Sequence, residues 1–271
     1  MEKTRIGFIG CGNMARAMIS NFALSRELDD IQVMVSDVNK NALESVRQDG
    51  VKTTQDNALV AEFAEILFLT VKPSNAGGAL NNISPYLDGE KIIVSAMAGI
   101  PLIAIKTMLH KAKKFVRCMP NLAARVGHGM TGICFDNLSE EEQSDILELL
   151  GSTGRTAVIP EKNFDIVTAL SGGGGAYVYL FIQALMEAGM ARGLTEEEAR
   201  LLAAQTVYGG AKMALASNDK FDAMVSAVCS KGGTTIEAVN VLEDSEFSRI
   251  IDKAVDAAWR KSRALTQTFK F

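Results

Sequence analysis

The pattern of hydrophobic and polar residues changes near residue 160. Before it, short apolar runs alternate with segments whose apolar residues recur at helical spacing. This alternation favours a parallel sheet with crossover helices. The predicted strands are Arg5–Ile9, Ile31–Val35, Ile66–Val71, Ile92–Ala96, Phe115–Val116 and Thr156–Ile159. The predicted helices are Asn13–Leu24, Asn41–Gln48, Pro101–Leu109 and Glu140–Leu150, the last opened by a Ser139–Glu142 capping box.

The part of the chain after Pro160 contains no convincing strand alternation and is rich in Ala, Leu, Met and Val at helical spacing. Thr195 and Glu198 form a second capping box at the start of a helix. Residues 176–190 are apolar on nearly every face, so this helix needs burial against its own chain and a second subunit. We therefore expect two domains, 1–160 and 161–271, of which the second is all-helical and dimerises.

Composition and charge narrow the function. The 271 residues are 48% hydrophobic and 22% charged, which allows a sizeable core. The net charge of −4 gives no electrostatic footprint for nucleic acid, so no such partner is expected. No apolar run approaches the length of a membrane span, and no basic-then-apolar leader precedes the first strand. We expect no membrane partner.

Cysteine and histidine usage argues against structural metal and disulfide bonds. The four cysteines form no C-x-x-C pair, and His110 and His128 lie apart without ligand-spaced partners. No metal site is expected. Free thiols in a reducing compartment are the simplest interpretation, which predicts a cytoplasmic protein. The cysteines are Cys11, Cys118, Cys134 and Cys229.

A glycine motif joins the first predicted strand to the first helix. Gly10, Gly12 and Ala15 follow the dinucleotide fingerprint G-x-G-x-x-A. Gly10 permits a tight turn, Gly12 lets the backbone approach a pyrophosphate, and Ala15 permits close packing of helix on sheet. The helix N-terminus adds amide donors and a positive dipole end. The context favours an α/β Rossmann domain that binds a dinucleotide over a purely structural turn.

The second strand ends near Ser36 and Asp37, where such a domain reads the ribose. An acidic residue there favours NADH. Ser36 suits either a ribose or a phosphate, however, and Lys40 is close behind. Asp37 as a simple turn residue is an equal alternative, so the choice between NADPH and NADH stays open.

Two further motifs follow predicted strands, at the edge of the sheet where ligands bind. Val71, Lys72 and Pro73 form the first, although a surface charge and a strand terminator explain them equally well. The second is R-C-M-P-N, in which Asn121 is placed to hydrogen-bond a ligand or to form a turn.

The helical part contains two glycine-rich motifs. Residues 171–177 read S-G-G-G-G-A-Y, and four glycines at a helix start indicate close backbone approach to a cofactor, a substrate or another helix. Residues 230–235 read S-K-G-G-T-T. Glycines and hydroxyl residues at a helix start suit a carboxylate, although an ordinary N-cap explains them equally well.

Taken in order, these segments resemble pyrroline-5-carboxylate reductase over nearly the whole chain: G-F-I-G-C-G-N-M-A, V-K-P, R-C-M-P-N, L-S-G-G-G-G-A-Y and S-K-G-G-T-T. The resemblance implies a Rossmann domain, a helical dimerisation domain, and an active site completed at the interface of a homodimer or an assembly of dimers. It implies an oxidoreductase of proline biosynthesis that transfers hydride from NADPH or NADH to the C=N carbon of L-1-pyrroline-5-carboxylate, giving L-proline.

The resemblance also assigns residues. The residues that it implies as contacts of the dinucleotide are Gly10, Gly12, Asn13, Met14, Ser36, Asn57, Val71, Lys72, Pro73, Ala96, Ala98 and Asn121. The residues that it implies as contacts of the substrate carboxylate are Val228, Ser230, Gly233, Thr234 and Thr235. Thr235 is the implied catalytic residue, through a hydrogen bond to the ring nitrogen. An imine that arrives protonated needs little acid–base machinery, so the enzyme's share is positioning and charge placement.

Several positions depart from the family pattern. Gly173 and Gly175 stand where it has Ser and Pro, Lys231 stands where it has Pro, and Leu122-Ala123 replace Thr-Pro. These departures leave two alternatives: a reductase of a related cyclic imino acid, and a non-catalytic dinucleotide-binding regulator. A β-hydroxyacid dehydrogenase is disfavoured, because Lys212 lacks an Asn four residues later.

Overall fold

The computed structural model describes residues 4–25, 31–47 and 50–269. Within these residues, eight strands form one sheet in the order β3-β2-β1-β4-β5-β6-β7-β8. Neighbouring strands are parallel except β6 and β7, which are antiparallel, so the expected parallel sheet is correct up to β6. The strands are β1 Thr4–Ile9, β2 Ile31–Ser36, β3 Lys52–Thr54, β4 Ile66–Leu69, β5 Ile92–Ser95, β6 Lys114–Met119, β7 Gly129–Asp136 and β8 Gly154–Val158.

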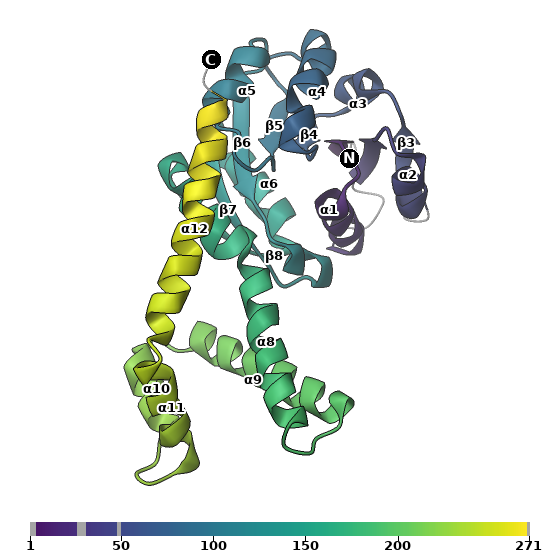
Figure 1. Ribbon diagram of the computed structural model, residues 1–271. Coiled ribbons are helices and arrows are strands. Elements are labelled where there is room, and N and C mark those ends of the chain that lie inside the picture. Colours follow the sequence, from purple (N-terminus) through teal and green to yellow (C-terminus); the bar gives the residue numbers. More distant parts are fainter. Residues whose placement is uncertain (1–3, 26–30, 48–49, 270–271) are drawn as a thin grey trace. The chain divides into compact units, whose positions relative to one another are not determined.

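Helices cover both faces of this sheet (Figure 1). They are α1 Asn13–Ser25, α2 Lys40–Arg47, α3 Asn57–Phe63, α4 Ala76–Ile83, α5 Leu102–Met108, α6 Glu140–Gly151 and α7 Phe164–Val167. Short 3-10 turns lie at η1 Pro73–Asn75, η2 Ser84–Tyr86, η3 Leu122–Val126 and η4 Glu161–Asn163, and a π turn lies at η5 Thr168–Gly172. The expected helices in this part are confirmed to within a few residues. The expected end of one of them, Gln48, lies outside the described residues.

The core consists of two apolar layers, one on each side of the sheet. Helices α1, α2 and α6 bury their apolar faces in one layer, and α3, α4 and α5 bury theirs in the other. The strands contribute to both, because successive side chains point to opposite faces. Phe8 of β1 stacks on Phe68 of β4 in the first layer, with ring centroids 4.7 Å apart, while Ile9 points into the second layer.

The chain divides into two compact units. Residues up to Gly175 and residues from Ala257 onwards form the first, and Ala176–Asp256 forms the second. This division differs from a boundary at residue 160, because the segment that follows packs with the sheet. Phe164 of α7 is fully buried in the second core layer, and the Asp165 carboxylate accepts hydrogen bonds from the hydroxyls of Ser262 and Thr266 at 2.7 and 2.9 Å.

The second unit is helical, as the sequence predicts. Its helices are the main part of α8 Gly174–Met190, α9 Glu196–Ala216, α10 Phe221–Val228, α11 Thr234–Asp244 and the first part of α12 Phe247–Thr268. The expected capping box of Thr195 and Glu198 opens α9.

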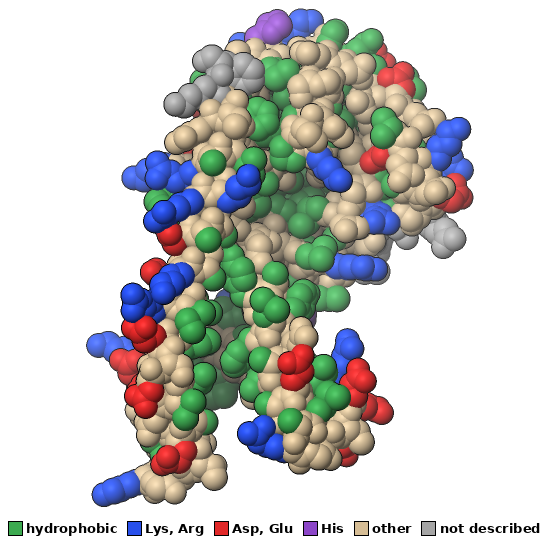
Figure 2. Space-filling model, viewed as in Figure 1, with side chains coloured by type: hydrophobic (Ala, Val, Ile, Leu, Met, Phe, Trp, Pro, Cys, Tyr) green, Lys and Arg blue, Asp and Glu red, His purple; other side chains and the backbone are tan. Residues whose placement is uncertain are grey.

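The second unit leaves much of its apolar surface uncovered. No residue of α8 is buried within the single chain, although the sequence requires burial of this helix. Leu180, Leu201 and Met213 are each more than 60% exposed, at 66, 67 and 67%. Figure 2 shows hydrophobic side chains gathered on the surface of these helices. A single chain therefore supplies only part of the burial that these helices need.

Candidate active site

The glycine turn is built as the sequence predicts. β1 ends at Ile9 and α1 begins at Asn13. Gly10 between them has φ of 101°, a backbone conformation that residues with a side chain rarely adopt. A Cβ on Gly10 would lie 3.0 Å from the backbone carbonyl carbon and oxygen of Thr70. A Cβ on Gly12 would meet nothing within 4 Å. Gly10 thus serves a close approach of two backbones, whereas Gly12 presents open space at the N-terminus of α1.

A cleft of about 550 Å³ lies beside this turn, at the carboxyl ends of β1, β2 and β4. Ligands of open α/β sheets bind at this edge. Six residues expected at the dinucleotide line the cleft together: Gly10, Gly12, Ser36, Asn57, Val71 and Lys72. The structure therefore brings these six residues from separate motifs to one edge of the sheet.

Hydrogen bonds fix the polar side chains of the β2 end. Ser36 is fully buried, and its hydroxyl donates to Oδ1 of Asn57 at 2.6 Å. Oδ2 of Asp37 accepts from the backbone N–H of Cys11 at 2.7 Å, and its Oδ1 accepts from that of Asn39 at 2.7 Å. Asp37 also lines the cleft.

The other six residues expected at the dinucleotide do not line this cleft: Asn13, Met14, Pro73, Ala96, Ala98 and Asn121. Asn13 and Met14 begin α1, Pro73 begins η1, and the two alanines follow β5. The side chain of Asn121 instead forms hydrogen bonds with other residues of the protein. Its Oδ1 accepts from the backbone N–H of Met130 at 3.2 Å, and its Nδ2 donates to the Ser171 hydroxyl at 3.5 Å.

Several cleft residues are absent from the sequence-based set: Val38, Asn39, Thr70, Asn75, Gly78 and Ala79. Thr70 directly follows β4, and its hydroxyl donates to the backbone oxygens of Ile9 and Gly10 at 3.0 and 2.8 Å. The position of Thr70 directly after a buried strand could have identified it from the sequence as a cleft residue. Gly78 and Ala79 lie inside α4, and no local pattern marks them as cleft residues.

The residues expected at the substrate lie together in the second unit. α10 ends at Val228, and α11 begins at Thr234 with Gly233 as its N-cap residue. The backbone N–H of Gly233 donates to the Ser230 carbonyl at 2.9 Å and closes the intervening turn. Val228, Ser230, Thr234 and Thr235 are exposed in this unit. The structure therefore brings these residues to one helix start.

The run of four glycines has a partial structural explanation. A Cβ on Gly172 would lie 3.2 Å from the Met119 sulfur, so this glycine allows η5 to pack closely on the end of β6. Cβ atoms on Gly174 and Gly175 would meet nothing within 4 Å. Helix packing accounts for the first glycine, and nothing in the structure explains the last two.

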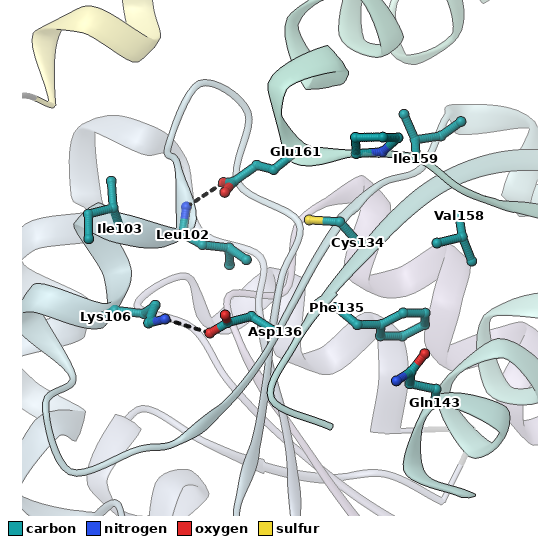
Figure 3. A pocket seen from close by; sticks show the side chains of 11 residues that line it. Leu102, Ile103, Lys106, Cys134, Phe135, Asp136, Gln143, Val158, Ile159 and Glu161 are labelled. Atoms are coloured by element: carbon teal, nitrogen blue, oxygen red, sulfur yellow. Dashed lines mark hydrogen bonds and ion pairs between the residues drawn. The ribbon is translucent and has the colours of Figure 1, made fainter. Parts of the chain in front are cut away.

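A second cavity, of about 650 Å³, lies between α5, α6 and the ends of β7 and β8 (Figure 3). Lys106 and Asp136 form an ion pair of 2.6 Å at its wall. Glu161 accepts from the Leu102 backbone N–H at 2.6 Å. It also accepts from the buried Arg117 guanidinium at 3.1 Å. Arg117 of the R-C-M-P-N motif therefore holds η4 against the sheet.

The Cys11 thiol beside the glycine turn is buried in the first core layer. Burial and, to a smaller extent, the negative charge of Asp37 raise the pKa of Cys11 to about 11. The thiol also donates to the Ala42 carbonyl at 3.3 Å. Among the described residues, no group of three or more His, Cys, Asp or Glu side chains is arranged to hold a metal ion.

The glycine turn, the parallel sheet and the cleft at its carboxyl edge define a dinucleotide-dependent oxidoreductase class. Residues 5–99 match the family described as NADP oxidoreductase coenzyme F420-dependent, and residues 161–265 match pyrroline-5-carboxylate reductase dimerisation. The pyrroline-5-carboxylate reductase of Escherichia coli K12 is 35% identical over 99% of this chain and 100% of its own length. The chain belongs to the pyrroline-5-carboxylate reductase family.

Other relatives agree. The Methanosarcina acetivorans pyrroline-5-carboxylate reductase is 33% identical over 98% of this chain and 99% of its own. The solved Plasmodium falciparum pyrroline carboxylate reductase, which has NADP bound, matches with a TM-score of 0.86 at 31% identity, covering 98% of this chain and 99% of its own. The Coxiella burnetii enzyme matches with a TM-score of 0.88 at 31% identity and the same coverage.

The dimerisation match includes Glu161–Met190, a helical run long and apolar enough, by length and composition alone, to cross a membrane. The expectation that no apolar run approaches that length is wrong for this segment of the described chain. Membership of a dimerisation domain gives its apolar surface a different role, since a subunit interface also buries such a surface.

Proposed function

We propose that this protein reduces L-1-pyrroline-5-carboxylate to L-proline with NADPH or NADH, in proline biosynthesis. The observation that carries the proposal is the cleft at the glycine turn, in a chain similar over its full length to reductases of this name. The cofactor would supply a hydride for the C=N carbon. The residues of this chain bind and orient the two reactants.

The cleft suits a dinucleotide. Open space at Gly12 gives a pyrophosphate access to the backbone at the N-terminus of α1, where the helix dipole favours an anion. We assign Gly10, Gly12, Asn13 and Met14 to this turn. Ser36 and its hydrogen-bond partner Asn57 are assigned to the adenosine side, and Val71, Lys72, Pro73, Ala96 and Ala98 to the ribose and nicotinamide side.

We assign the substrate to the start of α11. Amides at this helix start and the hydroxyls of Ser230 and Thr234 suit a carboxylate, with Val228 and Gly233 beside them. The Thr235 hydroxyl is assigned to the ring nitrogen. An iminium that arrives protonated is already electrophilic, so positioning supplies most of the rate.

We propose a homodimer or an assembly of dimers, in the cytoplasm. The uncovered apolar faces of the second unit support the assembly. Three buried free cysteines, Cys11, Cys118 and Cys134, agree with a reducing compartment.

The test measures loss of NADPH and NADH absorbance when purified protein receives pyrroline-5-carboxylate. We expect turnover, and we expect Thr235→Val to lower kcat with little change in nucleotide affinity. The matched control is Thr206→Val, which makes the same change inside α9 and outside the assigned site, and which should leave kcat unchanged. Nucleotide binding without turnover of this imine would refute the proposed substrate and favour a related cyclic imino acid or a regulator.

A further inference from the structure

The carboxylate of Asp37 is held in one orientation in the dinucleotide cleft. Asp37 directly follows β2, and its two oxygens each accept one backbone N–H, from Cys11 in the glycine turn and from Asn39 in the next loop, both at 2.7 Å. An ionised carboxylate has about four acceptor sites, so further donors can bind without breaking these bonds. Asp37 is therefore a preorganised acceptor at the edge of the cleft.

The two charged residues that line the cleft lie on opposite sides of β1. Asp37 and Lys72 are its charged lining residues among those described. Asp37 follows β2 and Lys72 comes shortly after β4, and β1 with its glycine turn lies between these two strands. The end of β2 is where a Rossmann domain contacts the adenosine ribose. The ribose side of the cleft is therefore negative.

The cations near the β2 end have other partners or lie off the cleft. Arg47 pairs with Glu44 at 2.9 Å, and Arg16 donates to the side chain of Asn13. Lys40 begins α2, is exposed and does not line the cleft. Among the residues that the structure describes, these positions leave the charge of Asp37 without a cationic partner where a ribose substituent would sit.

We infer that Asp37 makes this enzyme select NADH over NADPH. A ribose 2′-hydroxyl donates a hydrogen bond to the fixed carboxylate, whereas a 2′-phosphate brings two negative charges and only acceptor oxygens to the same place. The inference rests on the proposed function in that it takes the cleft to bind a nicotinamide dinucleotide. It does not depend on which imine is reduced.

The test is the ratio of two dissociation constants, measured by fluorescence titration of NADH and of NADPH without imine. We expect the wild-type protein to bind NADH at least about tenfold more tightly, the ratio that one charge-assisted hydrogen bond supplies. Asp37→Ser should reduce this preference by at least about tenfold. Equal or tighter binding of NADPH by the wild type, or an unchanged ratio in Asp37→Ser, would overturn the inference.

The matched control is Asp88→Ser. Asp88 also accepts two backbone N–H groups, from Glu90 and Lys91 at 2.9 and 3.1 Å, but it precedes β5 and so lies at the opposite edge of the sheet. This variant makes the same change in charge and should leave the ratio unchanged; an equal shift in both variants would overturn the assignment to Asp37.

Nucleotide binding and imine reduction, measured separately, distinguish failure of this inference from failure of the proposed function. If Asp37→Ser does not fold, the wild-type ratio and the isosteric Asp37→Asn still decide the question. A folded wild-type protein that binds neither nucleotide would overturn both this inference and the proposed function. Preferential NADH binding without reduction of pyrroline-5-carboxylate would support the inference and refute only the proposed substrate.

Discussion

Alanine substitutions at the two glycines of the turn should have different effects: Gly10→Ala should lower the stability of the fold, and Gly12→Ala should lower the affinity for the cofactor. Gly10 and Gly12 are two residues apart, yet their surroundings differ completely. At Gly10 the backbone has φ of 101°, and an added Cβ would lie 3.0 Å from backbone atoms of Thr70 and Val71. At Gly12 the added atom would meet nothing within 4 Å.

The expected cost of Gly10→Ala follows from these two features. Backbone strain at such a φ costs about 1–3 kcal/mol, and overpacking against the backbone that directly follows β4 costs about 1–3 kcal/mol more. The lower entropy of the unfolded alanine chain offsets about 0.4–1 kcal/mol. The net destabilisation should be about 1–5.5 kcal/mol, a large share of the stability of an ordinary domain.

Gly12→Ala should leave the free energy of unfolding within about 1 kcal/mol of the wild-type value. Its methyl group enters the open space where a pyrophosphate would approach the backbone, so NADH affinity should fall at least about tenfold. Urea unfolding measures the first quantity and nucleotide fluorescence titration the second. A Gly12→Ala protein that binds NADH like the wild type, or a Gly10→Ala protein of unchanged stability, would refute the reasoning.

Three further predictions concern stability and reactivity. Asp165→Ala should lower the free energy of unfolding by about 1–3 kcal/mol in urea titrations, because the hydroxyls of Ser262 and Thr266 lose their shared acceptor, and Asp165→Asn should cost less. Burial raises the pKa of Cys118 to about 12, so mass spectrometry should find this thiol unlabelled by maleimide at pH 8 in native protein and labelled in urea; fast native labelling would contradict its burial. The hydrogen bond from Lys114 lowers the pKa of Glu142, so their pairing stabilises the fold at neutral pH and is lost as pH falls below about 4.3. Glu142→Gln should flatten this acid dependence of the free energy of unfolding, measured in urea titrations, by up to about 1 kcal/mol.

The sequence predicted elements best where apolar periodicity was strong. β1, β2, β4 and β5 are buried and nearly continuous in apolar residues, and their expected ends agree to within two residues. The capping box of Ser139 and Glu142 marks the start of α6 correctly, because both of its hydrogen bonds form between residues three apart.

The missed elements depend on contacts between distant residues. β3 is only three residues long and partly exposed, and α3 follows it closely. β7 begins G-M-T-G, which weakens its strand pattern. It forms because β6 and β8 pair with it on both sides, and a Cβ on Gly132 would lie 2.8 Å from Val167, so this strand position has to be small.

By itself the sequence determined the strand–turn–helix unit at Gly10, the helical character after Pro160 and the family, because these depend on local spacing and on the order of motifs. Only the tertiary structure decided that Asp37 lines the cleft and that the Asn121 side chain accepts a hydrogen bond from the Met130 backbone. It also decided that the segment before Gly175 packs with the sheet. Each of these depends on residues far apart in the chain that meet only when the sheet has formed. Local periodicity specifies an element, whereas the partner of a polar side chain is specified by the packing of several elements.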